Sequence, residues 1–232
     1  MWKTAQNILT TIVIFISGFL YGLFAIPSVL ICYYVIGYSE YSTIINKSIL
    51  FSFALGFGYL FWMFNTILGI GIISYILKPN FKLIEMPFFS ITTFRWAFLS
   101  VLDRLAKPYI SKMAPSWIVD VYYKLLGCEM GKGVIIASDR INDVFMVKIG
   151  SGSIVGSKAS ITAHIAEKNF IVLAPVIIGK NCLIGLGSQI NPGCKVGDNS
   201  VIASRAVLPK YTEVPPGQVW GGVPAKFIKK AV

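Results

Sequence analysis

The chain contains one histidine, His164, among its 232 residues. Imidazole is the side chain whose charge ordinarily changes between about pH 5 and 8, so it can take the proton from a hydroxyl or amine that attacks a carbonyl. Asp139 and Asp143 precede it and could orient a polar acceptor or assist the imidazole. The alternatives are that His164 is an ordinary surface or core group and that the two aspartates cap turns. The elements around His164 have to decide between these interpretations.

Aliphatic residues recur at every sixth position in the C-terminal half of the chain. The clearest run is Ile178, Ile184, Ile190, Val196, Ile202 and Leu208. The fifth position of the same units is small, as in Cys182, Ser188, Cys194, Ser200 and Ala206. This period is typical of a parallel β-solenoid, in which each unit is a short strand and a turn and the aliphatic side chains stack inside. Glycine at the second position, as in Gly179 and Gly185, is expected to support tight turning.

The six-residue pattern begins near Gly127 and is broken once beside the histidine. After the unit that starts at Ile161, residues Glu167 to Ile171 interrupt the series, and Val172 restarts it. His164 is at the fourth position of its unit, next to this break. Loops can form a cleft there without a cost to core packing, which favours a functional role for the imidazole.

The repeats resemble those of the hexapeptide-repeat acyltransferases. The resemblance runs from about Gly127 to Lys230 and includes the ending VPPGQVWGGVPAKFIKK. It implies a left-handed β-helix with three faces, a homotrimer, and acyl-coenzyme A in the groove between adjacent subunits. A histidine before an inserted loop and a restart at Ala174-Pro175 is similar to the galactoside and maltose acetyltransferase type. The segment Leu125 to Cys128 and the place of the histidine also resemble the membrane-embedded C-terminal region of the poly-ε-lysine synthetase group.

The resemblance implies a role for several residues. His164 would be the general base, and the backbone N–H of Leu186 would donate to the oxyanion. The donor, acetyl-coenzyme A or another acyl thioester, would contact Gly185, Ala203, Ser204, Lys210, Gly221, Gly222, Pro224 and Lys226. The alternative for the lysines among these is that they lie on a solvated face or contact anionic lipid. The acceptor would bind near Asp139 and Asp143.

Other classes of protein find little support in the sequence. A zinc carbonic anhydrase built on a β-helix needs three histidine ligands per site, and each chain has one to offer. The four cysteines have no metal-like spacing, so no metal is expected. The sequence has no GxGxxG, Walker or HExxH motif. The net charge is +11, but the basic residues of the repeats are not interleaved with aromatic residues. This pattern favours binding to a membrane surface over binding to a nucleic acid.

Two long uncharged runs dominate the N-terminal third. They lie between Lys3 and Glu40 and between Lys47 and Lys78, and each exceeds the roughly 20 apolar residues that span a bilayer as a helix. We predict transmembrane helices over about residues 7–34 and 48–77; a cleaved signal peptide is the alternative for the first. Since Lys3, Lys78 and Lys82 flank the membrane ends, both termini and the β-helix are expected in the cytoplasm, with residues 38–47 outside.

We therefore expect three parts: a transmembrane hairpin (1–79), amphipathic interfacial helices (80–126) and a β-helix acyltransferase domain (127–232). In the middle part, a helical stripe and nearby aromatic residues favour the bilayer interface over a helix docked on the domain. The stripe is Phe94, Ala97, Phe98, Val101, Leu102 and Leu105, and the aromatic residues are Trp96, Trp117, Tyr122 and Tyr123.

The sequence thus predicts a membrane-anchored, trimeric acyltransferase. It would move an acyl group, with acetyl as the first choice, to a hydroxyl or amine of a small-molecule or lipid-linked acceptor near the membrane. An amide-forming aminoacyl transferase that uses a thioester donor is one alternative. A non-catalytic trimeric scaffold on the membrane is another.

Overall fold

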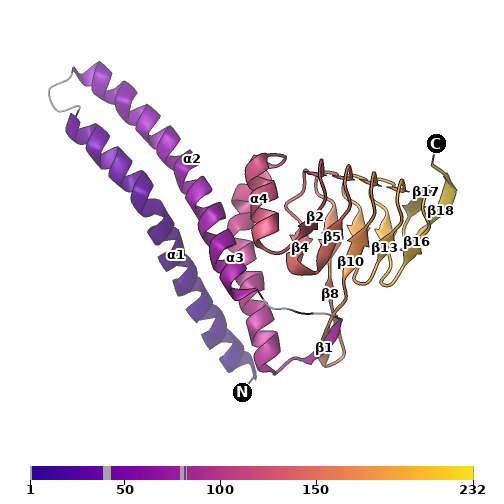
Figure 1. Ribbon diagram of the computed structural model, residues 1–232. Coiled ribbons are helices and arrows are strands. Elements are labelled where there is room, and N and C mark those ends of the chain that lie inside the picture. The colour runs from indigo at the N-terminus through magenta and orange to yellow at the C-terminus, as the bar shows by residue number, and fades with distance from the viewer. Residues whose placement is uncertain (1, 39–42, 79–80, 82, 232) are drawn as a thin grey trace. The chain divides into compact units, whose positions relative to one another are not determined.

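The computed structural model describes residues 2–38, 43–78, 81 and 83–231. The chain divides into two compact units, Met1–Ile70 and Gly71–Val232, and each is described by itself. The first unit contains helix α1 (Trp2–Tyr38) and most of α2 (Ile44–Leu77). The second contains the end of α2, two further helices and all the strands (Figure 1). Residues 39–42 of the predicted outer loop, and Lys82, lie outside the described residues.

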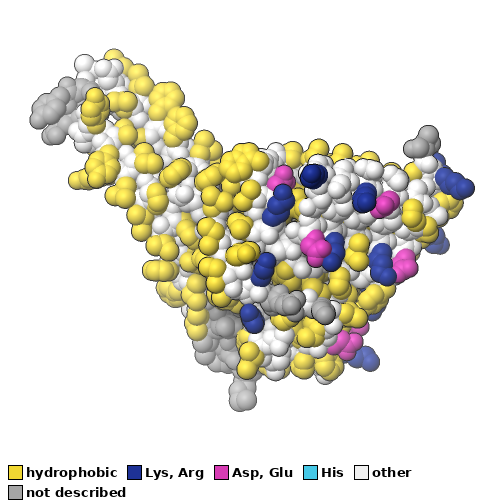
Figure 2. Space-filling model, viewed as in Figure 1, with side chains coloured by type: hydrophobic (Ala, Val, Ile, Leu, Met, Phe, Trp, Pro, Cys, Tyr) yellow, Lys and Arg dark blue, Asp and Glu magenta, His cyan; other side chains and the backbone are white. Residues whose placement is uncertain are grey.

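Helices α1 and α2 form an antiparallel hairpin in the first unit. Trp62 Nε1 donates to the Tyr21 carbonyl at 3.1 Å, and Cys32 Sγ contacts the Ala54 carbonyl at 3.5 Å. A methyl group added at Gly58 would lie 3.3 Å from Cys32 Sγ, so the missing side chain permits this close approach. Both helices are longer than predicted. Thr11–Tyr38 and Ile44–Leu77 are long and apolar enough to cross a membrane, and Figure 2 shows the hydrophobic side chains that cover the hairpin.

The C-terminal half is a parallel β-helix with three sheets. Successive strands enter the sheets in rotation, and each pairs with the strand one coil later, as Ile178 with Val196 and Ile184 with Ile202. The first sheet contains β2 (Glu129–Met130), β5 (Val147–Ile149), β10 (Val176–Ile178), β13 (Lys195–Val196) and β16 (Glu213–Val214). The second contains β3 (Ile135–Ile136), β6 (Ile154–Val155), β11 (Leu183–Ile184), β14 (Val201–Ile202), β17 (Gln218–Gly222) and the antiparallel β18 (Ala225–Lys230). The third contains β4 (Ile141–Asn142), β7 (Ser160–Thr162), β12 (Gln189–Ile190) and β15 (Val207–Leu208).

The core of the β-helix follows the period read from the sequence. The six aliphatic residues from Ile178 to Leu208 are all buried, and so are the small residues at the fifth position. A coil of three short strands leaves little room at its corners, which is why Cys, Ser and Ala occupy them. The predicted solenoid is confirmed.

The glycines at the second position act differently from the prediction. The left-handed backbone occurs two residues later, at the fourth position, as in Asn181 (φ 52°), Gly187 (φ 65°) and Arg205 (φ 60°). At Gly185, an added Cβ would lie 2.5 Å from the Ser204 backbone nitrogen in the next coil. Glycine is therefore needed at Gly185 because the coils stack closely there, whereas the left-handed turn lies at the fourth position.

Truncation of one core residue should test this packing. Ile190→Ala is expected to lower the free energy of unfolding by about 2–5 kcal/mol, because Ile190 is fully buried and the coils cannot collapse onto the cavity. Its neighbour Gln189 points outward from the same strand, so Gln189→Ala should change stability by at most about 0.5 kcal/mol. Chemical denaturation of both variants measures the difference, and equal losses would contradict the assigned faces.

The break in the repeats is a β-hairpin. Strands β8 (His164–Glu167) and β9 (Phe170–Leu173) pair antiparallel, and β1 (Ile84–Pro87) adds a third strand along β9. The Phe88 N–H continues this contact by donating to the Asn169 carbonyl at 3.1 Å. The segment after α2 is thus hydrogen-bonded to the hairpin that begins at His164.

Helices α3 (Ile91–Met113) and α4 (Trp117–Leu125) pack in the same unit as the β-helix. The buried stripe of α3 is Leu99, Leu102, Ala106 and Ile110, and only Leu102 of the predicted stripe is buried. Tyr122 and Tyr123, expected at the interface, are fully buried, and Tyr123 donates to the Ser138 carbonyl at 2.8 Å. The sequence stripe missed this face because Phe94 and Phe98, which are exposed, fit the same helical spacing. The buried faces of α3 and α4 therefore pack against the domain.

Candidate active site

His164 and Asp143 form a hydrogen-bonded pair. Asp143 is in the left-handed region (φ 53°) between β4 and the 3₁₀ turn Val144–Met146, and His164 is the first residue of β8. The His164 Nδ1 lies 2.5 Å from Asp143 Oδ2. The aspartate side chain is 1% exposed and the histidine side chain 32%. Asp143 is therefore held inside the protein, and the imidazole reaches solvent.

This geometry selects one protonation form of the neutral ring. A carboxylate only accepts hydrogen bonds, so Nδ1 must carry the proton that lies between the two groups. The lone pair of the neutral imidazole is then on Nε2, which can take a proton from a reacting group. The pair has the arrangement that a general base with an orienting carboxylate requires.

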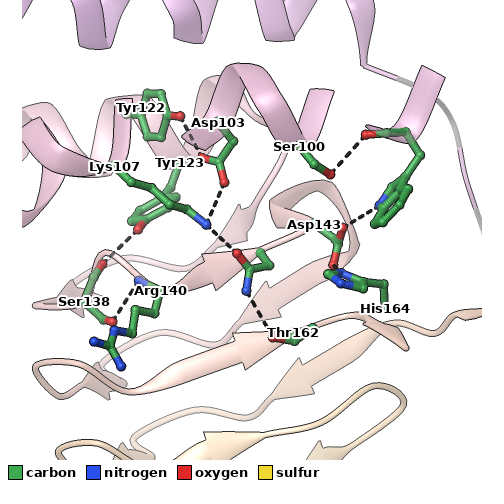
Figure 3. Close-up of polar contacts among 12 residues, drawn as sticks. Ser100, Asp103, Lys107, Tyr122, Tyr123, Ser138, Arg140, Asp143, Thr162 and His164 are labelled. Carbon is green, nitrogen blue, oxygen red and sulfur yellow. Dashed lines mark hydrogen bonds and ion pairs between the residues drawn. The ribbon is translucent and has the colours of Figure 1, made fainter. Parts of the chain in front are cut away.

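The other oxygen of the Asp143 carboxylate binds Trp96. The indole Nε1–H of Trp96, on α3, donates to Asp143 Oδ1 at 2.7 Å. The indole also contacts the His164 ring edge to face, with centroids 4.9 Å apart and planes at 66°. A helix that precedes the repeats therefore touches both members of the pair. Figure 3 shows His164 beside Asp143, and Lys107 of α3 pointing toward the strands of the β-helix.

A second group of contacts joins α3 to the same region. Asp103 is buried, lies 3.0 Å from Lys107 Nζ, and accepts from Tyr122 Oη at 2.8 Å. Lys107 also hydrogen-bonds Asn142, whose Nδ2 donates to Thr162 Oγ1 at 3.1 Å. Burial raises the pKa of the Asp103 carboxyl, while the Lys107 charge opposes that rise. Since Asn142 and Thr162 flank Asp143 and His164 in sequence, this network fixes the two strands from which the pair projects.

Trp96 and Lys107 were not identified as site residues from the sequence, although a signal was present. Trp96, Ser100, Asp103 and Lys107 follow one another at spacings of four, three and four residues. Such spacing places them on one face of a helix, beside the buried apolar stripe. A polar stripe next to an apolar one predicts that the helix packs on something that carries hydrogen-bonding groups.

The predicted donor-binding residues lie on a different corner of the β-helix. Gly185 follows β11, Ala203 follows β14, and Gly221 is in β17, so the three succeed one another along the second sheet. A methyl group at Gly221 would lie 3.1 Å from Ala203 Cβ, and one at Gly185 would meet the Ser204 backbone. These residues form a smooth column. Gly222 and Pro224 turn the chain from β17 into β18 at its end.

Leu186 is beside this column. It is half exposed in the turn after β11, and its carbonyl accepts from the Arg205 N–H at 2.9 Å. His164, by contrast, follows β7 of the third sheet. The proposed oxyanion donor and the proposed base therefore belong to corners on opposite sides of the third sheet within one chain.

Two of the three other charged residues proposed for the site, Asp139 and Lys210, have ion-pair partners. Asp139 pairs with Lys158 at 3.2 Å. Lys210 forms an ion pair with Glu167 at the end of the hairpin strand β8, and this hydrogen bond raises the pKa of Lys210. Lys226 is exposed on β18, next to Gly221. Of the two aspartates, only Asp143 contacts the imidazole.

A small cavity lies behind Asp143. Its volume is about 30 Å³, and its lining includes Ser74, Leu99, Asp103 and Asp143. That volume suits one or two water molecules, whereas ligand sites usually occupy some 300–1,000 Å³. The cavity is therefore too small to hold a substrate.

The repeats match a known family of proteins. The family model described as bacterial transferase hexapeptide, with six repeats, matches residues 172–210. The repeat region is of the bacterial transferase hexapeptide type. The three sheets extend this architecture in both directions, from Glu129 to Gly222. The resemblance predicted from the sequence is confirmed.

Individual relatives are similar to parts of the chain. A delta-poly-L-ornithine synthetase of Acinetobacter baumannii is 23% identical over 142 residues, which are 61% of this chain and 10% of that protein. A galactoside O-acetyltransferase of Escherichia coli is 33% identical over 97 residues, 39% of this chain and 47% of that protein. The chain thus spans less than half of either relative. The solved structure of a galactoside acetyltransferase in complex with coenzyme A is 20% identical, with a TM-score of 0.47 over 62% of this chain and 86% of that one.

Proposed function

We propose that the protein is a membrane-anchored acyltransferase that moves an acyl group, with acetyl as the first choice, from coenzyme A to a hydroxyl or amine. The observation that carries the proposal is the Asp143–His164 pair at the break in the hexapeptide repeats. His164 Nε2 takes the proton of the acceptor as it attacks the thioester carbonyl, and Asp143 holds the imidazole in the reactive tautomer. The new C–O or C–N bond forms as the C–S bond breaks, and the proton passes to the leaving thiolate.

We further propose that the β-helix is left-handed and that three copies assemble. The outward residues of the second sheet support a subunit contact, because they form an apolar ladder of Ile135, Ile154, Leu183, Val201 and Val219. The corresponding ladder of the first sheet carries Glu129, Lys148, Lys195 and Glu213 around a single Ile177. Apolar exposure of this kind is typical of a surface that another subunit covers.

Assembly through the second sheet would complete the site. The column of Gly185, Ala203 and Gly221 is at the edge of that sheet, so a neighbouring subunit that covers the sheet can bring its own His164 to the column. The donor would then lie between two subunits, with the Leu186 N–H near the oxyanion and Lys226 available to a phosphate. Acyl-donor binding would require the assembled protein.

A substitution in the ladder tests the assembly. Leu183→Asp should convert the trimer to monomers, since each contact would bury an uncompensated carboxylate at a cost of roughly 3–5 kcal/mol. The matched control is Ile177→Asp, because Ile177 is exposed to a similar degree (37% against 43%) on the charged sheet. Light scattering after size-exclusion chromatography in detergent measures the mass. A trimer that survives Leu183→Asp, or dissociates equally with both variants, would exclude this sheet as the contact.

We propose that helices α1 and α2 anchor the protein in a membrane with both termini and the β-helix in the cytoplasm. The length and apolar character of the helices support the anchor, and the basic residues after Leu77 support the orientation. Phe94 and Phe98, exposed on α3, would face the lipid interface. The acceptor is then a small molecule or lipid-linked compound made at that surface. Inside-out vesicles expose the cytoplasmic face, so added protease should digest the β-helix. Protection of the β-helix in these vesicles would show that the orientation is the opposite one.

The decisive experiment uses the full chain in detergent with labelled acetyl-coenzyme A and a panel of sugar, amine and lipid-linked acceptors. Transfer of label is expected. Coenzyme A at about a hundred times its dissociation constant should also stabilise the folded protein by about 2.7 kcal/mol. Neither transfer nor stabilisation by coenzyme A or an acyl thioester would contradict the proposal and leave a scaffold as the function.

Likeness to the delta-poly-L-ornithine synthetase favours one second candidate, an amide-forming transferase that uses an aminoacyl thioester. The same base would then deprotonate an amine, and the product would be an amide. Supplying an aminoacyl thioester in place of acetyl-coenzyme A distinguishes the two reactions, because only the second candidate forms a peptide or isopeptide product from it.

A further inference from the structure

We propose that Trp96 is a positioning residue for the Asp143–His164 pair, so that helix α3 completes the active site of the β-helix. The inference rests on the proposed acyl transfer for its kinetic part. Trp96 lies outside the hexapeptide repeats, on a helix that precedes them. It therefore adds to the site a residue that the repeat pattern does not contain.

The indole hydrogen bond can run in one direction only. An indole has one donor and no acceptor, and here the donor is committed to Asp143 Oδ1 at 2.7 Å. The imidazole occupies Oδ2 of the same carboxylate at 2.5 Å. With both oxygens bound by donors from different elements, the plane of the carboxylate is fixed. A carboxylate that cannot rotate presents Oδ2 to Nδ1 alone.

The indole also limits the movement of the His164 ring. The two rings meet edge to face at 4.9 Å, a favourable arrangement for aromatic pairs. The imidazole is thus restrained by a hydrogen bond at Nδ1 and by a ring contact on its side, while about a third of the His164 side chain stays exposed. Trp96 restrains the aspartate and the histidine together.

Trp96 is itself held in place. Three helical turns further along the same face of α3, Lys107 binds Asn142, the residue before Asp143. The hydroxyl of Ser100 donates to the Trp96 carbonyl at 3.0 Å, and the neighbouring Leu99 and Leu102 are buried. A rigid helix clamped at two points can deliver one N–H to a fixed place, which is what support of a catalytic group requires.

Trp96→Phe is the direct test, because it removes the N–H and keeps an aromatic ring against His164. We expect kcat for acyl transfer to fall about tenfold to a hundredfold, the loss of a hydrogen bond to a charged group, with KM within about twofold. Trp117→Phe, on α4, is the matched control and should leave both constants unchanged. Melting temperatures show whether each variant keeps its fold. Should Trp96→Phe unfold, 3-benzothienylalanine at position 96 keeps the shape of indole with sulfur in place of N–H.

A second readout does not depend on activity. Because His164 is the only histidine, ¹⁵N-histidine labelling gives the NMR signals of one imidazole. In the wild-type protein, the neutral ring should be a single tautomer with the proton on Nδ1. In Trp96→Phe, or with the sulfur isostere, the Asp143 carboxylate is free to turn away from Nδ1, so both tautomers should be populated. A single unchanged tautomer together with an unchanged kcat would overturn the proposal.

The two readouts separate this inference from the proposed function. If no donor and acceptor support transfer in the wild-type protein but the tautomers still change on substitution, Trp96 positions the pair and the acyltransferase proposal fails. If transfer occurs and both kcat and the tautomer resist the loss of the N–H, the acyltransferase proposal stands and Trp96 only packs against the site.

Discussion

His164→Ala is expected to lower kcat for acyl transfer by about a hundredfold to ten-thousandfold. The imidazole is the proposed base, and its Nδ1 is bound to Asp143, so alanine removes the proton acceptor without a substitute. Binding of coenzyme A should persist, since the column of Gly185, Ala203 and Gly221 is on another corner of the coil. Initial rates and a thermal shift with coenzyme A measure the two effects separately.

The fold should survive this change, because the His164 side chain is about one-third exposed. Ala166→Ser, on the exposed side of the same strand, serves as the control and should retain full activity. A His164→Ala protein that keeps more than about a tenth of the wild-type kcat would remove the histidine from the role of general base.

Asp143→Asn is expected to lower kcat by a comparable factor, about a hundredfold to ten-thousandfold. The amide keeps the size of the side chain and can turn its NH₂ toward Nδ1, which would stabilise the tautomer with the lone pair on the wrong nitrogen. Asparagine tolerates the left-handed backbone at this position (φ 53°), so the loss would be chemical rather than structural. Kinetics and the ¹⁵N signals of His164 measure both consequences.

Asp139→Asn provides the matched control for that experiment. Both aspartates were candidates from the sequence, but Asp139 pairs with Lys158 at the surface. Its conversion to asparagine should change kcat by less than about twofold, because Asp139 pairs with Lys158 and not with the imidazole, and loss of a surface ion pair costs little stability. Equal losses from Asp139→Asn and Asp143→Asn would show that the orienting role assigned to Asp143 is wrong.

The sequence predicted the β-helix because a fixed period forces a fixed geometry. Each six-residue unit needs an aliphatic residue on its strand and a small residue at its corner. About ten such units occur in the chain, so the same pattern indicates the fold about ten times. His164 and Asp143 were identifiable for a related reason, since both are beside interruptions of that period. The sequence pattern was sufficient to identify a candidate site residue wherever the regular six-residue period was interrupted.

The contribution of α3 could not be predicted in the same way. Its sequence supports two apolar stripes, one through Phe94 and Phe98 and one through Leu99 and Leu102, and spacing alone does not say which is buried. The hydrogen bond from Trp96 to Asp143 joins residues 47 apart in the chain. Such a contact depends on how the helix docks, which is a tertiary property. The pairing of β1 with β9 is hidden from sequence patterns for the same reason.

The strand pairing also limits how the chain can change in length. Ile178, Ile184 and Ile190 pair with Val196, Ile202 and Leu208, so one complete coil takes 18 residues. Duplicating a segment such as 179–196 would lengthen the prism and return every later strand to its own sheet. Duplicating six residues would keep the aliphatic period but rotate all later strands by one side, carrying the glycine column away from the apolar ladder. Insertions and deletions during divergence should therefore comprise whole coils of 18 residues. The other tolerated insertion is a loop such as the β8–β9 hairpin, which leaves the β-helix and returns to it at the same corner.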